Sequence, residues 1–124
     1  MATREFDIKK IYSTTLDSVN LKFSNLSDNT IEIKRKNMLS VSKNEINNIR
    51  IVEDVTLKGK KDLDPFITVR TIAIFKTTNE DKNYSLDGAS EEFREKLFAP
   101  THSMTREIVA KLTEASFGKP LIIK

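Results

Sequence analysis

The sequence predicts an α+β fold rich in β-structure, in which a bent antiparallel sheet or partly open barrel is capped by a C-terminal helix. Residues 14–86 contain a series of short runs in which apolar and polar residues alternate, as in half-buried strands. Residues 90–117 change to the spacing of an amphipathic helix. The 124 residues fit one domain, 1–124. Strands followed by a single helix form an architecture used more often for binding than for catalysis.

The first two alternating runs predict a hairpin. One run ends at Phe23 and the next begins at Ile31, which shares a face with Ile33. Asp28 and Asn29 lie between the runs, and their side chains form hydrogen bonds that stabilise turns. The sequence therefore predicts that the two runs pair with each other.

The later runs predict the rest of the sheet. Residues 39–42 form a third short strand, and residues 49–57 form one long bent strand or two short ones. Residues 66–78 are the richest in β-branched side chains, which predicts a central strand. Its alternation changes phase near Thr71, so we expect a bulge or a strand buried on both faces. Tyr84–Leu86 is the last predicted strand.

The C-terminal segment carries the signals of a helix. Ser90 is suited to cap its start, and Gly118 followed by proline marks its end. Pro100 either kinks one long helix or begins a second one. A stripe spaced four and three residues apart is predicted to cover the sheet: Met104, Ile108, Leu112 and Ala115.

The tail after the helix is apolar. Leu121, Ile122 and Ile123 follow Pro120, which cannot continue the helix. Exposing these side chains to water is unfavourable. We therefore expect the tail to act as an edge strand, paired with its own sheet or with a second chain in a homodimer, and we mark these three residues as partner-binding candidates.

The residue types argue against common catalytic sites. The chain has no cysteine, and its single histidine, His102, is interpreted as a surface or capping residue. The three glycines stand apart, which excludes a glycine-rich phosphate loop. No metal-binding spacing is present, so no metal and no cofactor is predicted. Glu53 and Asp54 are adjacent carboxylates that point in different directions along a strand, and a carboxylate-based enzyme stays a minor alternative.

The charge pattern offers one candidate binding site. A net charge of +3 is small for a nucleic-acid-binding protein and argues against that class. Two basic clusters could nevertheless bind an anion, although they could also simply solvate a strand end and a loop. The candidate anion-binding residues are Lys34, Lys36, Lys58, Lys60 and Lys61.

The sequence also indicates the cellular compartment of the protein. No apolar run approaches the length of a transmembrane segment, and the N-terminal residues lack the apolar core of a secretory signal. Together with the absence of cysteine, this predicts a cytoplasmic protein.

The order and spacing of the runs resemble bacterial pleckstrin-homology-like and GRAM-like domains over residues 16–117. The resemblance is carried by LKFSNLSDNTIEIKRK (21–36), by LSVSKNEINNIRI (39–51), and by the long strand and closing helix that follow. It implies a strongly bent antiparallel sheet plugged by the helix, in a family of adaptors for lipids, peptides or other subunits. Its phosphoinositide-binding members carry a basic motif that Lys22 and the 34–36 cluster approximate, with a lysine where the family has its last arginine.

These observations predict a non-enzymatic interaction module that binds a protein partner, which could be a second copy of the chain. The contact would involve an exposed sheet edge, the helix surface or the tail. The first alternative is a domain that binds an anion or an anionic lipid headgroup through the lysines named above. The second is a carboxylate-based enzyme or a structural protein of a phage or mobile element.

Overall fold

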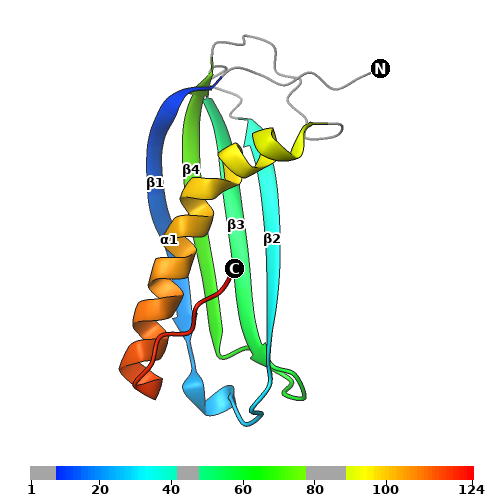
Figure 1. Ribbon diagram of the computed structural model, residues 1–124, viewed down its shortest axis with the longest axis vertical. Coiled ribbons are helices and arrows are strands. Elements are labelled where there is room, and N and C mark those ends of the chain that lie inside the picture. The colour runs from blue at the N-terminus through cyan, green and yellow to red at the C-terminus, as the bar shows by residue number, and fades with distance from the viewer. Residues whose placement is uncertain (1–7, 42–47, 78–88) are drawn as a thin grey trace.

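The computed structural model describes residues 8–41, 48–77 and 89–124. One antiparallel sheet has the strand order β1-β4-β3-β2, and α1 lies across one of its faces (Figure 1). The predicted α+β fold is confirmed, with an open sheet rather than a barrel, and the predicted strand at Tyr84–Leu86 lies outside the described residues. The elements are β1 (Ile8–Leu21), the short 3-10 helix η1 (Phe23–Asn25), β2 (Ile31–Val41), β3 (Asn48–Gly59), β4 (Ile67–Thr77) and α1 (Glu91–Phe117).

The predicted hairpin between the first two runs is wrong. β1 pairs with β4 and β2 pairs with β3, so β1 and β2 are the two opposite edges of the sheet. Asp28 accepts a local hydrogen bond from the Thr30 N–H at 3.1 Å, as expected of a turn-forming residue, and Asp28 and Asp62 also join two loops. The Asp62 carboxylate accepts a hydrogen bond from the backbone N–H of Ser27 at 3.0 Å, and Asp28 accepts one from the backbone N–H of Lys61 at 2.9 Å.

β4 is a central strand, as predicted, and it carries no bulge against β3. Its pairing with β3 continues without a register shift along its whole length. The irregularity lies in β1, where Leu16 pairs with Thr71 and Ser18 pairs with Arg70, so that Asp17 is an extra residue. Thr71 is a polar residue on the sheet face that α1 covers, and Ile72 is an apolar residue on the opposite face. The phase change seen in the sequence near Thr71 therefore comes from these two side chains.

Strand alternation divides the sheet into a face covered by α1 and an open face. The buried side chains of the covered face form two apolar clusters. The tail-side cluster contains Val55, Leu57, Phe66, Ile67, Val69, Val109 and Ile123. The cap-side cluster, toward the start of α1, contains Ile49, Ile51, Ala73, Phe75 and Leu97.

α1 is one continuous helix, and Pro100 kinks it rather than starting a second helix. Its first turns run in a different direction from the rest (Figure 1). The Ser90 hydroxyl oxygen caps the helix by accepting a hydrogen bond from the Phe93 N–H at 3.1 Å. Gly118 ends it in the left-handed conformation, with φ of 77°, and its N–H bonds to the Glu114 carbonyl.

The face that α1 turns toward the sheet is one residue away from the predicted stripe. Ile108 borders the tail-side cluster, whereas Ala115 is exposed. Threonines occupy three of the buried positions, and a hydroxyl such as that of Thr113 donates to the Val109 carbonyl at 2.8 Å. The buried residues of the helix are Leu97, Thr101, Thr105, Val109 and Thr113.

The C-terminal tail packs on the covered face without forming a strand. Residues 121–124 have no strand assignment, so the expected pairing with an edge of the chain's own sheet is not formed. The Leu121 N–H instead donates to the Thr113 hydroxyl at 2.7 Å, which turns the chain back beside the helix (Figure 1). Ile123 is 1% exposed inside the tail-side cluster, so side-chain burial replaces backbone pairing.

Candidate functional site

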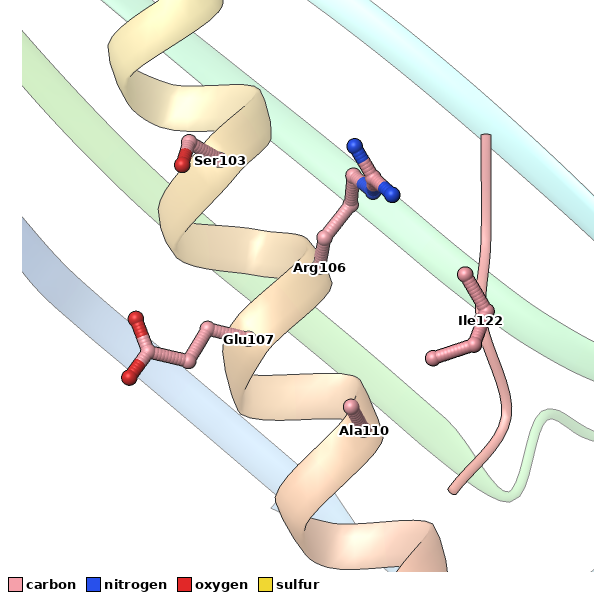
Figure 2. Close-up of a pocket in the computed structure, with 5 residues that line it drawn as sticks. All are labelled: Ser103, Arg106, Glu107, Ala110 and Ile122. Carbon is pink, nitrogen blue, oxygen red and sulfur yellow. The ribbon is translucent and has the colours of Figure 1, made fainter.

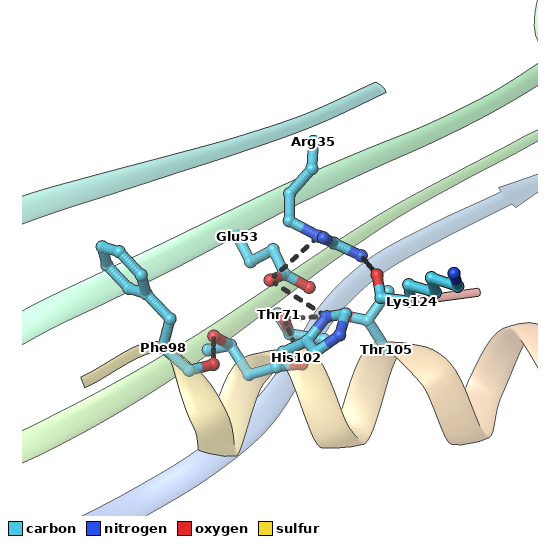
Figure 3. Close-up of polar contacts among 8 residues, drawn as sticks. Arg35, Glu53, Thr71, Phe98, His102, Thr105 and Lys124 are labelled. Carbon is cyan, nitrogen blue, oxygen red and sulfur yellow. Dashed lines mark hydrogen bonds and ion pairs between the residues drawn. The ribbon is translucent and has the colours of Figure 1, made fainter. Parts of the chain in front are cut away.

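A layer of polar side chains separates the two apolar clusters. The strand register places Asn37, Glu53 and Thr71 side by side across β2, β3 and β4. Thr101 and Thr105 of α1 contact Thr71: the Thr71 hydroxyl lies 3.4 Å from the Thr101 carbonyl oxygen, and the Thr71 and Thr105 hydroxyl oxygens are 3.0 Å apart, within hydrogen-bonding distance (Figure 3). We call these five residues the polar layer.

Glu53 is the most unusual member of this layer. Its side chain is fully buried, and within the described residues neither carboxyl oxygen has a hydrogen-bond partner. The nearest charged or titratable groups are Arg35 Nε at 3.6 Å and His102 Nδ1 at 3.7 Å (Figure 3). Burial raises the pKa of the Glu53 carboxyl, while the Thr105 hydroxyl and the Arg35 charge oppose that shift. Burying a carboxyl whose oxygens accept no hydrogen bond at normal distance is costly, which marks Glu53 as a functional candidate.

Two partly exposed side chains cover this carboxyl. Arg35 and His102 are 30% and 26% exposed, and the Arg35 guanidinium also donates to the backbone carbonyl of Lys124. Burial lowers the pKa of His102, and the charges of Arg35 and Arg106 lower it further, so the imidazole is mainly neutral at pH 7. The expectation of a surface or capping histidine therefore missed its position beside Glu53.

The sequence contained a signal for Glu53. The alternation that places Ile51 and Val55 on the covered face also places Glu53 there, between them. Glu53 and Asp54 were expected to point in different directions, but Glu53 was not assigned to the covered face. Arg35 carried the same signal, because it continues the alternation of Ile31 and Ile33, but the basic run 34–36 was interpreted only as a candidate anion-binding cluster.

A pocket of about 410 Å³ lies between the first turns of α1 and strands β2 and β3. This volume is within the range of small-ligand sites. Its lining combines charged groups of both signs with an apolar wall. The sheet contributes Arg35, Asn37 and Glu53, and the helix contributes Glu91, Arg94, Glu95, Phe98 and His102.

Glu53 and His102 are the groups of this pocket that could each hold a proton near neutral pH, and the chain has no cysteine to act as a nucleophile. Across residues 8–41, 48–77 and 89–124, no group of three or more His, Cys, Asp or Glu residues could hold a metal ion.

A second feature is the helix-facing side of the edge strand β1. Leu16, Val19 and Leu21 are 46%, 38% and 41% exposed, although each pairs with a buried residue of β4. In the described part of the chain, no strand pairs with the outer edge of β1 (Figure 1). We call these three residues the β1 strip. Exposed apolar side chains along a free strand edge are typical of a surface that binds another polypeptide.

The lysines predicted to bind an anion are divided between the open face and a turn. Lys34 and Lys36 are exposed, and strand alternation places them on the open face together with Lys58. The Lys58 ammonium is already engaged, because it donates to the Asp62 carbonyl at 2.9 Å and lies 3.9 Å from Glu32. Lys60 and Lys61 follow in the exposed turn after β3.

Among the tail residues predicted to bind a partner, Ile122 is the most exposed, at 63%. Ile122 borders a shallow hollow of about 220 Å³ between the tail and the outer side of α1 (Figure 2). The helix contributes Ser103, Arg106, Glu107 and Ala110 to this hollow. Polar and apolar side chains are mixed in its lining, and the side chains shown lie apart from one another, so it offers no concentrated apolar site.

Comparison with solved structures identifies the fold. The chain is similar to the SecB-like chaperone Rv1957 of Mycobacterium tuberculosis, solved in complex with a ChAD peptide from the Rv1956 HigA1 antitoxin. That match has a TM-score of 0.69 and 12% identity over 93% of this chain and 85% of the chaperone. The chain is also similar to a protein of unknown function from Streptococcus agalactiae, with a TM-score of 0.55 and 11% identity over 98% and 99% of the two chains.

No protein-family model matches the chain, and no curated protein matches it. The comparisons establish a SecB-like fold and overturn the predicted pleckstrin-homology-like or GRAM-like fold. The error has a physical origin, because hydrophobic spacing located strands but could not show that β1 and β2 are opposite edges. No helix of the described residues is both long and apolar enough to cross a membrane.

Proposed function

We propose that this chain is a non-enzymatic protein-binding module that holds an extended apolar segment of a partner protein against the β1 strip. The observation that carries the proposal is the exposure of Leu16, Val19 and Leu21 along a strand edge that no other described strand covers. The similarity in fold to a chaperone solved with a bound peptide supports the same class of function.

Strand addition explains how such a segment would bind. An extended peptide can pair with a free sheet edge through its backbone, while alternate side chains contact one face of the sheet. On β1 that face carries Leu16, Val19 and Leu21, whereas the same face of the opposite edge strand β2 has the polar Arg35 and Asn37 between Ile33 and Leu39. The register shifts in β1 make its backbone irregular, which weakens backbone pairing with a peptide. Apolar side-chain contacts would therefore supply much of the affinity.

A pair of matched double variants tests this proposal. Replacing Leu16 and Leu21 by Ser removes apolar surface from the strip, and replacing Thr15 and Asn20 by Ser changes neighbours whose register partners lie on the open face. The full chain should suppress the light scattering of aggregating reduced insulin. The Leu16→Ser/Leu21→Ser variant should lose most of that activity, and the control should keep it. Equal activity of the two variants, or none in the wild type, would contradict the proposal.

Anion binding by the lysines of the open face and of the turn after β3 is a second proposal, supported by the exposure of Lys34, Lys36 and Lys60. Binding to vesicles that contain an anionic lipid should weaken as salt is added, because exposed charges are screened. Reversing the charge at Lys34 and Lys60 should abolish it. Binding that persists in the variant would exclude these residues as the site.

The tail residues remain candidates for a protein contact, including one with a second copy of this chain. Ile122 supports this proposal because it stays exposed while Ile123 is buried. If the chain is a dimer in solution and Ile122 contributes, Ile122→Ser should lower the sedimentation coefficient toward that of a monomer. An unchanged assembly would remove the tail from the interface.

A further inference from the structure

We propose that the pocket beside the polar layer binds a guanidinium group, such as the arginine side chain of a peptide. This site lies between α1 and strands β2 and β3, so the inference is independent of the β1 strip. It assigns a role to the buried carboxyl of Glu53.

The first argument is a surplus of hydrogen-bond acceptors. Within the described residues, both carboxyl oxygens of Glu53 and the side-chain oxygen of Asn37 are buried without a hydrogen-bond partner. The two residues are direct neighbours across β2 and β3, and both line the pocket. A guanidinium presents five N–H donors in one plane and has no acceptor, so it complements a wall of this kind.

The second argument is charge. The lining contains three acidic residues (Glu53, Glu91 and Glu95) and two basic residues (Arg35 and Arg94), which gives 2 − 3 = −1 with His102 neutral. Glu91 and Glu95 are exposed on the first turns of α1, where they can attract a cation toward the pocket.

The third argument concerns access to Glu53. The Arg35 guanidinium lies at 3.6 Å and also bonds to the Lys124 carbonyl, so it holds a position that a ligand guanidinium could share or take over. Arg35 and His102 are partly exposed, which leaves room for their side chains to turn aside. Phe98 supplies an aromatic wall on which a guanidinium can stack.

The test uses the full chain and small probes of known chemistry. Butylguanidinium and the neutral, similarly shaped butylurea are titrated against ¹⁵N-labelled protein. Butylguanidinium should give saturable NMR shifts centred on Arg35, Asn37, Glu53, Phe98 and His102, and butylurea should give none. Shifts that are absent, scattered over the surface or equal for the two probes would overturn the proposal.

Matched variants then test the role of Glu53. Glu53→Gln should weaken butylguanidinium binding by about tenfold, because a charge-assisted hydrogen bond is lost. Asp54→Asn removes the same charge from the next residue on the open face and should leave binding unchanged. Arg35→Gln removes the competing cation and should tighten it. Equal weakening by the Glu53 and Asp54 variants would mean a general charge effect and would overturn the site.

A further variant keeps the test decisive if Glu53→Gln does not fold. Asn37→Ala removes the second acceptor and should weaken binding about threefold or more, as expected for a neutral hydrogen bond. Binding as tight as in the wild type would contradict the proposed contact.

The source of the guanidinium is distinguished by a second pair of probes. An arginine flanked by alanines in a capped tripeptide is compared with the same tripeptide containing citrulline. Tighter binding of the arginine peptide than of butylguanidinium indicates a peptide ligand, and weaker binding indicates a free small cation. Equal binding of the arginine and citrulline peptides would overturn recognition of the charge. Because these probes do not use the β1 strip, their failure would leave the proposed function standing.

Discussion

Glu53 and Asp54 are adjacent carboxylates on β3 with opposite surroundings. Glu53 points under α1, where it is fully buried and lacks a hydrogen-bond partner among the described residues. Asp54 points to the open face and accepts two hydrogen bonds from the Arg70 guanidinium, at 2.6 and 2.9 Å. The comparison shows that the covered face holds a polar group at an energetic cost, while the open face pairs its charges in water. Both the pocket and the β1 strip lie on the covered side.

The largest expected difference between the two faces concerns apolar packing. Ile51 is completely buried in the cap-side cluster, whereas its neighbour Arg50 is exposed on the open face. Ile51→Ala should lower the free energy of unfolding by about 2–5 kcal/mol. Arg50→Ala should change it by about 0.5 kcal/mol or less. Urea denaturation of both variants checks this, and similar losses would mean that the faces are not distinguished by burial.

The next effect concerns the charge of Glu53. Burial raises its pKa in the folded chain, so the native state binds this proton more tightly than the unfolded state does. The stability contributed by this group is present below the unfolded pKa and falls as pH rises through the folded pKa. Glu53→Gln should therefore stabilise the protein most at neutral pH, with the advantage shrinking toward acid pH. The side-chain amide of the introduced glutamine can also donate a hydrogen bond to the side-chain oxygen of Asn37, which has no partner among the described residues.

This pH test must account for the groups around Glu53. Arg35 faces it from β2, Thr71 from β4, and His102 and Thr105 from α1. Because the pKa of His102 is lowered, its own contribution to stability is lost as pH falls, which is the opposite direction. Thermal unfolding across pH should therefore compare Glu53→Gln with its parent in a His102→Asn background. A variant that is less stable than its parent at neutral pH would show that the Glu53 charge is favourable.

A smaller effect is expected from the hydroxyl pair in the polar layer. Thr71 and Thr105 join β4 to α1 with their oxygens 3.0 Å apart, and both side chains are buried. A double-mutant cycle with Thr71→Val and Thr105→Val should give a coupling of about 0.5–1.5 kcal/mol. The coupling should not change with salt, because neither group is charged. A coupling near zero would mean that the helix is held there by packing alone.

The smallest effect is expected on the open face. Asp54 and Arg70 form a bidentate ion pair, but both side chains are partly exposed. A cycle with Asp54→Asn and Arg70→Gln should give about 0.2–1 kcal/mol, decreasing as salt is added. A larger coupling that resists salt would show that the open face is shielded from solvent, as it would be in an assembly.

Local patterns in the sequence were sufficient for the type of most elements. β-Branched runs identified the central strand β4, and Ser90 and Gly118 fixed the ends of the helix. The hairpin failed because strand pairing depends on contacts distant in sequence, such as those of Asp62 with Ser27 and Asp28. Turn-forming residues indicate where the chain turns and do not indicate which strand comes next in the sheet.

The candidate site was harder to predict because it depends on the context of polar residues. The predicted stripe was built from apolar side chains alone and is displaced by one residue, because Thr101, Thr105 and Thr113 are among the buried residues of the helix. Glu53 could have been found from the alternation of β3, but its surroundings depend on α1 and on Arg35 of β2. The exposure of the β1 strip follows from the path of the helix, which local spacing does not encode.

Hydrogen exchange of backbone amides in β1 tests the central claim most directly. The full chain is compared with its complex with reduced, unfolded insulin B chain, and exchange is followed by NMR. We predict slower exchange in β1 on binding, because its free edge becomes paired, with little change in β2. Protection confined to β2 or to the open face, or no protection at all, would contradict the assignment of protein binding to the β1 side of the sheet.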